Sequence, residues 1–203
     1  MEKKSQILEI LSDGSWHDRE QLSAQLGISG SELEAQLDSL RCSHPELRQV
    51  PELGVCLPRE PQRYDRRLLE ALAGGPVEVF DTIGSTNDAA RELFEQGAPH
   101  GAAALADQQT AGRGRMGRPF VSPSGTGIYV SVLLTAPEAL ENAHLVTPAA
   151  AVVTTGILER FTRAEIGIKW VNDLFCRGKK ISGILTEAVV REGKPAGMIV
   201  GTG

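Results

Sequence analysis

The chain has 203 residues, of which 41% are hydrophobic, 23% charged and 4% aromatic, and its formal net charge is −5. This length suffices for one large domain or for a small and a medium one, and so few aromatic side chains argue against a large stacking platform for nucleic acid. Three scattered cysteines without a C-x-x-C pair indicate neither a zinc site nor a redox motif and fit a reducing cytoplasm. Without a signal peptide or a run of roughly 18 apolar residues, the sequence predicts a cytoplasmic chain that makes no membrane contact.

Charge divides the chain into two modules. Residues 1–60 carry 6 Lys or Arg against 11 Asp or Glu, whereas residues 61–203 carry 15 of each. The segment Leu57-Pro58-Arg59-Glu60-Pro61 is rich in turn formers and charge, which is typical of a linker. We therefore expect one domain over residues 1–60 and a second over residues 61–203.

The first module is predicted to form three short helices and a hairpin. The expected elements are an apolar helical stripe over 7–11, a helix capped by Asp18, a third helix capped by Ser29 or Ser31, and strands near 47–50 and 55–57. A winged helix-turn-helix domain has this order of elements, namely two helices, a glycine-containing turn, a third helix and a hairpin.

The third helix of this module is acidic on its exposed side. Glu32, Glu34 and Asp38 precede a single Arg41 at its end. Because DNA affinity rests heavily on cations that neutralise phosphates, we expect weak, salt-sensitive DNA binding. The alternative is a winged-helix fold used for protein contact or domain packing.

The second module alternates helices and strands. Helices are expected over 66–73, 86–96 and 145–161, and strands over 77–80, 102–106, 127–134, 165–170, 174–176, 180–190 and 196–201. Several adjacent hairpins with separate helices indicate an α+β fold with a mixed or antiparallel sheet rather than a doubly wound one.

The segment from Gln109 to Arg118, with three glycines and three arginines, is the most informative part of the module. Such a composition gains little order from burial, and the planar arginine fork suits a carboxylate or a phosphate. The segment therefore predicts a mobile loop that closes over an anionic small ligand, such as a nucleotide or an adenylated acid. The alternative, an RG-rich RNA-binding segment, is disfavoured because the loop lies mid-chain between strand-like segments.

Three further segments carry candidate ligand-binding groups. Ser85-Thr86-Asn87 could cap a helix or read a polar ligand group, and Lys169-Trp170-Val171-Asn172-Asp173 places a lysine that could meet an anion or extend into solvent. In the third segment, residues 179–187, Gly183 permits close backbone approach, whereas Ile184 and Leu185 fit an ordinary core strand.

In this order and spacing, the four segments closely resemble those of the biotin protein ligases. The preceding winged helix resembles the bifunctional bacterial members, which are both ligase and biotin operon repressor. The resemblance implies a mixed-sheet catalytic domain of the biotin/lipoate-ligase type, similar to class II synthetases. It also implies an enzyme that uses ATP and Mg²⁺ to form biotinyl-5′-AMP from biotin and transfers the biotin to a lysine of the biotin carboxyl carrier protein.

The resemblance also implies roles for particular residues. Lys169 and Arg115 would be catalytic, facing the biotin carboxylate and the α-phosphate. The biotin-binding residues would be Ser85, Thr86, Asn87, Gln109, Arg113, Gly114, Arg115 and Lys169. The nucleotide-binding residues would be Arg113, Arg115, Arg118, Trp170, Asn172 and Lys180. No metal ligands are assigned.

Three departures from the family pattern affect these expectations. Met116 replaces a usual arginine, which removes one charge from the loop, and Val171 replaces a usual proline, which adds a backbone N–H. The family continues past the position of Gly203 with an asparagine and a small SH3-like barrel, so we expect a C-terminally truncated ligase. The alternatives are a non-catalytic biotin-sensing DNA-binding regulator and a lipoate-type carrier-protein ligase. The family can also form homodimers through the central sheet.

Overall fold

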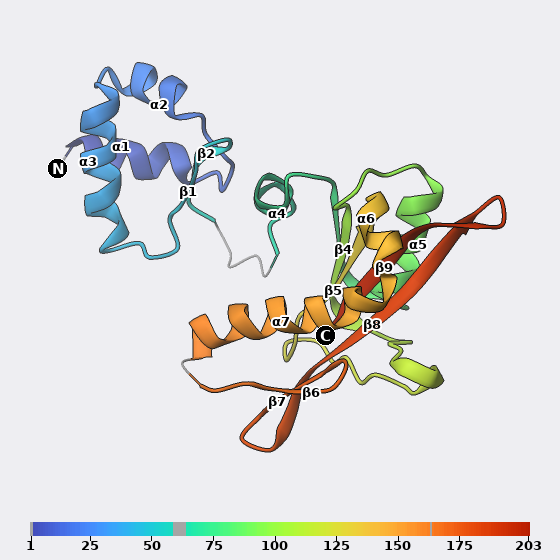
Figure 1. The fold of residues 1–203 in the computed structure, drawn as a ribbon. Helices are drawn as coiled ribbons and strands as arrows, with labels where there is room; N and C mark the ends of the chain where they lie inside the picture. Colours follow the sequence, from blue (N-terminus) through green and yellow to red (C-terminus); the bar gives the residue numbers. More distant parts are fainter. Residues whose placement is uncertain (1, 59–63, 163) are drawn as a thin grey trace. The chain divides into compact units, whose positions relative to one another are not determined.

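In the computed structural model, which describes residues 2–58, 64–162 and 164–203, the chain divides into two units, Met1–Leu72 and Ala73–Gly203 (Figure 1). The predicted linker lies partly outside the described residues, because positions 59–63 belong to neither described range.

The first unit contains three helices followed by a two-stranded antiparallel hairpin and a fourth helix. These are α1 (Glu2–Leu11), α2 (Arg19–Leu26), α3 (Gly30–Arg41), β1 (Arg48–Val50), β2 (Gly54–Cys56) and α4 (Arg66–Ala73). The Asp18 carboxylate accepts from the Gln21 N–H at the start of α2, and Ser29 forms a capping box with Glu32 at the start of α3. Of the two predicted caps of α3, Ser29 is therefore the one used.

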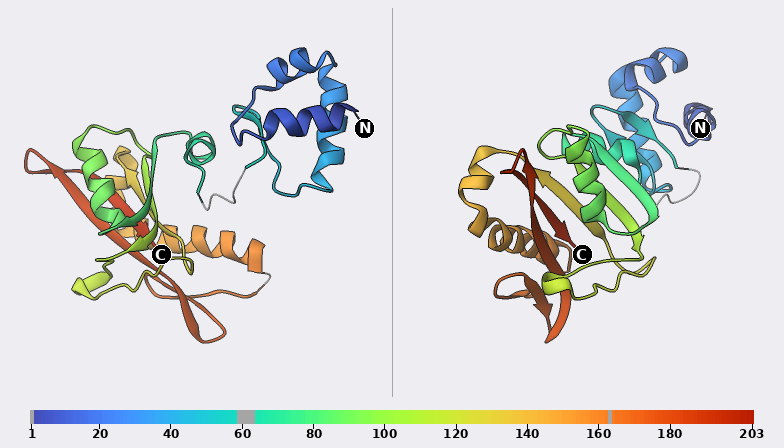
Figure 2. Two further views of the ribbon diagram at one scale, coloured as in Figure 1. Left: turned by 180° about the vertical axis from the view of Figure 1, so that it is seen from behind. Right: turned by 90° about the vertical axis from the view of Figure 1, so that its right-hand side faces the viewer.

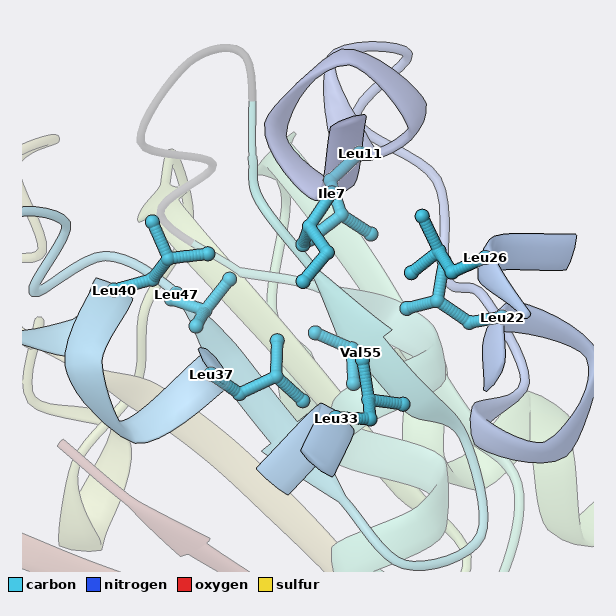
Figure 3. Close-up of a cluster of buried hydrophobic side chains, with 9 residues drawn as sticks. All are labelled: Ile7, Leu11, Leu22, Leu26, Leu33, Leu37, Leu40, Leu47 and Val55. Carbon is cyan, nitrogen blue, oxygen red and sulfur yellow. The ribbon is translucent and has the colours of Figure 1, made fainter. Parts of the chain in front are cut away.

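A cluster of leucine, isoleucine and valine side chains forms the core of this unit (Figure 3). Its members are Ile7, Leu11, Leu22, Leu26, Leu33, Leu37, Leu40, Leu47 and Val55. The three helices each contribute apolar positions three or four residues apart, so each buries one face against the others and the hairpin. The element order agrees with the expected order, and the assignment of a winged helix-turn-helix domain stays a prediction.

The second unit is built on a seven-stranded mixed sheet in the order β3-β4-β5-β9-β8-β7-β6. The strands are β3 (Val77–Ile83), β4 (Ala103–Gln109), β5 (Tyr129–Leu134), β6 (Gly167–Lys169), β7 (Asp173–Cys176), β8 (Lys179–Arg191) and β9 (Lys194–Thr202). Only β3 and β4 run parallel, and the other neighbouring pairs are antiparallel. The predicted mixed sheet is confirmed.

Helices cover both faces of this sheet (Figures 1 and 2). Helix α5 (Thr86–Glu95) packs on β4, β5 and β9, and α7 (Ala143–Thr162) packs on the opposite face over β6 to β9. Consecutive residues of β9 point to opposite faces, so Ile199 joins the α5 core and Val200 joins the α7 core. Because α5 begins beside β4 and β9, its N-terminus lies where these strands meet the arginine-rich loop.

The short elements were not predicted. Helix α6 (Pro137–Glu141) and the 3₁₀ turn η1 (Arg115–Gly117) are too brief to show an apolar period. Helix α7 buries Ala151, whereas its residues Ala149 and Phe161 are exposed. Within the described ranges, no helix combines the length and the hydropathy needed to cross a bilayer.

Candidate active site

A cavity of about 320 Å³ opens in the second unit at the N-terminus of α5. The walls come from four stretches of chain that are distant in sequence, namely 85–87, 109–120, 172–185 and 201–203. A volume of this size is within the range of small-molecule sites. The cavity unites parts of all four segments that the sequence singled out.

One wall of the cavity is a buried set of hydroxyl and amide groups. Ser85, Thr86 and Asn87 are each less than 5% exposed. The Gln109 side-chain oxygen accepts from the Thr86 backbone N–H at 2.8 Å and from the Thr86 hydroxyl at 3.0 Å, while its amide nitrogen donates to Ser122 Oγ at 2.9 Å. Ser85 occupies the N-cap position but its side chain makes no capping bond. Capping alone therefore does not explain the three polar residues.

Ser131 of strand β5 lies behind this wall and contacts it. Its fully buried hydroxyl lies 2.8 Å from Thr86 Oγ1 and 2.6 Å from Asn87 Oδ1. Thr86 and Ser131 carry one hydroxyl proton each, whereas three oxygen–oxygen contacts join them to each other, to Gln109 and to Asn87. Two protons satisfy only two of the three contacts, so the wall can accept an N–H or O–H donor from a ligand.

Glycines let the chain pass close to these polar groups. A Cβ at Gly201 would lie 2.1 Å from Asn87 Oδ1, and one at Gly112 would lie 2.5 Å from the Phe120 carbonyl oxygen. Neither distance is compatible with a side chain. The backbone of β9 therefore forms part of the wall itself, directly against the Asn87 amide.

The arginine-rich loop has a hydrogen-bonded frame of its own. Gly112 O accepts from the Phe120 N–H at 2.8 Å, and Arg118 O accepts from the Gly114 N–H at 2.7 Å. At its tip Met116 adopts a left-handed conformation with φ of 60° and is 89% exposed. Backbone pairing thus gives the loop a frame that its composition does not reveal, and its mobility and closure over a ligand stay a prediction.

The arginines of the loop differ in what they contact. Arg113 forms a bidentate pair with Asp88 at 2.8 and 2.5 Å, whereas Arg115 donates to the neutral Asn172 side-chain oxygen at 3.2 Å. Within the described parts of the chain, Arg118 makes no ion pair and lines the cavity. The charge of Arg113 is thus balanced by a carboxylate, and the charges of Arg115 and Arg118 are not.

The Asp88–Arg113 pair also affects protonation. The guanidinium hydrogen bonds hold the pKa of the Asp88 carboxyl below its ordinary value of 3.8. The same hydrogen bonds raise the pKa of Arg113. Both groups are therefore charged at neutral pH, and the pair fixes one end of the loop to the first turn of α5.

Lys180 supplies a further cation from strand β8. Its Nζ lies 2.8 Å from Asp173 Oδ1 and 5.8 Å from the centre of the Phe120 ring. The ion pair is not aligned as a hydrogen bond, so the buried Asp173 Oδ1 has no hydrogen-bond donor. Lys180 therefore reaches an anion in the cavity only by leaving its ion pair with Asp173.

The cavity brings together ten of the residues predicted to bind a ligand. They are Ser85, Thr86, Asn87, Gln109, Arg113, Gly114, Arg115, Arg118, Asn172 and Lys180. Asn172 is held in place because its side chain donates to the Ile184 carbonyl oxygen at 3.0 Å and its own carbonyl accepts from the Ile184 N–H.

Lys169 and Trp170 are not part of the cavity wall. Lys169 is exposed, with its Nζ 5.5 Å from the centre of the Phe175 ring, and Trp170 is 79% exposed. Lys169 nevertheless pairs in register with Asp173, and Asp173 with Gly183, both of which line the cavity. The lysine therefore lies on the same row across the sheet, two strands from Gly183, and its catalytic role stays a prediction.

Several residues of the site were missed from sequence. Phe120 lines the cavity, and Ser122, Ser131, Asp88 and Glu187 contact lining residues from behind. Ser131 carried a usable signal, because it is the single polar residue in the inward row Tyr129, Ser131, Leu133 of a predicted strand. No sequence signal points to the residues that contact Glu187, since they lie far from it along the chain.

The described residues contain no group of three or more His, Cys, Asp or Glu side chains that could hold a metal ion. Asp173, the one carboxylate in the cavity wall, is already paired with Lys180. These side chains do not form a protein cage for Mg²⁺, which commonly binds through one or two carboxylates together with substrate phosphates.

Curated proteins similar to this chain include bacterial ligases. The bifunctional ligase/repressor BirA of Escherichia coli (strain K12) is 30% identical over 198 residues, which is 97% of this chain and 61% of the relative. BirA of Bacillus spizizenii is 33% identical over 91% of this chain and 58% of its own length. The chain thus spans about three fifths of the length of these relatives.

The solved structures support the same grouping. The biotin protein ligase from Aquifex aeolicus in complex with biotin and ATP matches with a TM-score of 0.52 and 32% identity, over 62% of this chain and 50% of that one. Residues 79–203, which include every wall of the cavity, match the biotin/lipoate A/B protein ligase family. The chain belongs to the biotin/lipoate A/B protein ligase family.

Proposed function

We propose that the second unit binds biotin and ATP and joins them to biotinyl-5′-AMP, the first step of a biotin protein ligase. The observation that carries the proposal is the division of the cavity into a neutral polar wall and a cationic side. The wall at Ser85, Thr86 and Gln109 is short of a proton donor, which the N–H groups of a ureido ring supply. Arg115, Arg118 and Lys180 line the same cavity and suit a carboxylate and phosphates.

The adenylation step follows from this arrangement. A carboxylate oxygen of biotin attacks the α-phosphorus of ATP, a C–O–P bond forms, and the bond to the leaving pyrophosphate breaks. Two anions approach each other in this step, so fixed positive charge lowers the barrier. Arg115, held by Asn172, and Lys180, withdrawn from Asp173, supply that charge, and we propose that Lys169 joins them when ligands are bound.

The transfer step requires less of this unit. The amine of a carrier lysine attacks the acyl carbon of biotinyl-5′-AMP, an amide forms and AMP leaves. Positioning of the two reactants supplies most of the acceleration in such a step. We propose that the carrier is the biotin carboxyl carrier protein. One relative, from Paracoccus denitrificans, is a biotin--[acetyl-CoA-carboxylase] ligase, 39% identical over 51% of this chain and 43% of its own length.

We propose that Mg²⁺ enters with the ATP phosphates, where it neutralises their charge. Since the described residues offer no ligand cage, we assign the ion no protein ligands. Mg²⁺ commonly keeps several waters and binds substrate phosphates in this way.

A direct test incubates the chain with biotin, ATP, Mg²⁺ and a carrier domain and detects labelling with streptavidin. Calorimetry with biotin alone and with ATP alone runs in parallel. Labelling that requires both ATP and the carrier lysine supports the ligase. Absence of biotin binding even at millimolar concentration would overturn the proposal, and preferred labelling with lipoate would replace it with the lipoate-type ligase.

A second candidate function is a biotin-sensing regulator without catalysis. The exposed position of Lys169, outside the cavity wall, favours it over a fully assembled active site. Biotin binding without adenylate formation, measured by exchange of labelled pyrophosphate into ATP, distinguishes the sensor from the ligase.

We propose that the first unit is a winged helix-turn-helix domain with weak affinity for DNA. Three helices and a hairpin around one core support the assignment. The relative from Escherichia coli that is named ligase/repressor matches over 97% of this chain. We also propose a homodimer through the sheet of the second unit. Sedimentation with and without biotin and ATP tests the dimer.

A further inference from the structure

Glu187 lies behind the cavity and contacts two of its walls. It belongs to β8, and its side chain is 28% exposed. One carboxylate oxygen accepts from the Asn87 side-chain amide at 2.6 Å and lies 3.9 Å from the Arg113 guanidinium, and the other lies 3.9 Å from Arg91. Glu187 is the last residue of the segment 179–187. It is not among the predicted site residues, and it has no part in the proposed adenylation step.

The contact with Asn87 fixes the orientation of an amide in the neutral wall. A side-chain amide can rotate to exchange its oxygen and nitrogen, but only the nitrogen can donate to a carboxylate. With the nitrogen on Glu187, the oxygen faces Ser131 and the backbone of Gly201. Hydrogen bonds to a charged acceptor are stronger than neutral ones. Glu187 thereby sets which atom Asn87 presents to its neighbours.

The contact with Arg113 reaches the loop. Arg113 is held by Asp88 through two hydrogen bonds, and Glu187 is the second carboxylate near the same guanidinium. Asn87 and Arg113 both line the cavity, whereas Glu187 and Asp88 do not. One carboxylate therefore connects the first turn of α5 to the start of the loop that spans 112–120.

We propose that Glu187 is a positioning residue that couples the Asn87 amide to Arg113, so that binding of the polar end of the ligand and placement of the arginine-rich loop depend on one another. This inference rests on the proposed function for the identity of the ligand. The proposed coupling itself runs through the contacts of Glu187 with Asn87 and Arg113, and these contacts are present in the ligand-free chain.

The test is a double-mutant cycle on Glu187→Gln and Asn87→Ala, with biotin as the probe and calorimetry as the measurement. Removal of the charged acceptor is expected to weaken biotin binding about tenfold. Asn87→Ala should then cost far less in the Glu187→Gln background than in the wild type, because the coupled unit is already broken. The matched control is Glu95→Gln, which replaces an exposed carboxylate of α5 with a carboxamide and should leave biotin affinity unchanged.

Three outcomes separate positioning from simple support of the fold. Unaltered biotin affinity in Glu187→Gln, or effects of the two substitutions that multiply independently, would overturn the proposal. If Glu187→Gln does not fold, Glu187→Asp carries the test, since it keeps the charge but should withdraw it from Asn87; wild-type affinity in that variant also overturns the coupling.

A ligand-free readout keeps the inference separate from the proposed function. The Asn87 side-chain amide protons should exchange slowly and resonate apart from other amides in the wild type, and both features should weaken in Glu187→Gln, because a neutral carbonyl oxygen is a poorer acceptor than a carboxylate. A wild-type chain that binds no biotin would refute the proposed function alone. An Asn87 amide that does not respond to Glu187→Gln would refute the coupling alone.

Discussion

Arg115 combines two properties that no other residue of the loop has together. It is docked on the neutral Asn172 amide, which itself is bonded to Ile184, and its charge is not balanced by a carboxylate. Arg113 has a fixed position but a balanced charge, and Arg118 has neither an ion-pair partner nor, among the described residues, a docking contact. The electrostatic contribution to adenylation should therefore concentrate at Arg115.

Replacement of Arg115 with alanine should reduce kcat/KM for adenylate formation by about 100-fold, which is the usual cost of losing one preorganised charged donor. Arg115→Lys should recover part of the loss, because it keeps the charge but not the planar fork. Pyrophosphate exchange gives both values. An equal loss in Arg118→Ala would contradict the special position of Arg115.

Gly201 should tolerate no side chain. Gly201→Ala would place a methyl group 2.1 Å from Asn87 Oδ1, so the amide or strand β9 must move. Overpacking of this kind typically costs about 1–3 kcal/mol, and the displaced amide should also weaken biotin binding. Denaturant unfolding and calorimetry measure the two effects. Gly156→Ala is the matched control, since an added Cβ there meets nothing within 4 Å and lies inside helix α7.

Single residues also show what could be predicted from sequence. Ser85 and Thr86 are identified because polar residues stand where a loop meets a helix, whereas Gln109 is identified through the family resemblance. The structure unites all three in one wall. The pairing of Arg113 with Asp88 was not predicted, although both residues are plain in the sequence. The pairing depends on how the loop folds back over α5, and charge alone does not say which carboxylate an arginine will meet.

Helices and strands are predicted best where apolar residues repeat over enough positions to define a period. The strand expected over 127–134 is β5 (Tyr129–Leu134), and the helix expected over 145–161 is α7 (Ala143–Thr162). The loop over 112–120 has no period, and its frame comes from backbone bonds such as Phe120 N–H to Gly112 O. Such pairing is specific to tertiary structure and leaves no mark in composition.

The Asp88–Arg113 pair joins α5 to this loop and should make the stability of the unit depend on pH. The pKa of Asp88 is lowered in the folded chain, so its contribution is complete above the ordinary value of 3.8 and is lost as pH falls through the lowered value. The Asp88 side chain is 51% exposed, which limits the contribution to about 1 kcal/mol or less.

The measurement is denaturant unfolding of the wild type and of Asp88→Asn between pH 3 and 7. The wild type should be the more stable protein at neutral pH, and the difference should shrink toward zero at the acid end of the range. A difference that is constant over the whole range would show that the carboxylate charge is not the cause. High salt should reduce the neutral-pH difference, as screening of a partly exposed pair requires.

At the scale of the whole molecule, the two units differ in how their cations are used. In the second unit Arg115 and Arg118 line the cavity without a carboxylate partner among the described residues. In the stretch 2–58 of the first unit every Lys and Arg is engaged within the fold. Lys3 donates to Leu26 O and Lys4 to Ser39, whereas Arg19 pairs with Glu34, Arg41 with Asp38 and Arg48 with Asp65.

This difference leads to a prediction about DNA. The exposed side of α3 presents Glu32 and Asp38, and the nearby Arg19 and Arg41 are already paired with carboxylates, so phosphate contacts must break ion pairs that exist in the free chain. Binding to duplex DNA should therefore be no tighter than the non-specific range of about 10⁻⁴–10⁻⁶ M at physiological salt.

Fluorescence anisotropy with labelled duplexes at several salt concentrations checks the prediction. Affinity should rise by roughly tenfold or more as salt falls from about 0.2 to 0.05 M, because the few contacts formed are electrostatic. Asp38→Lys should strengthen binding to every duplex alike, since it adds a phosphate contact and releases Arg41 from its pair. Nanomolar binding of the unaltered chain to one duplex at physiological salt, with little salt dependence, would show that α3 reads DNA through contacts that do not depend on its charge.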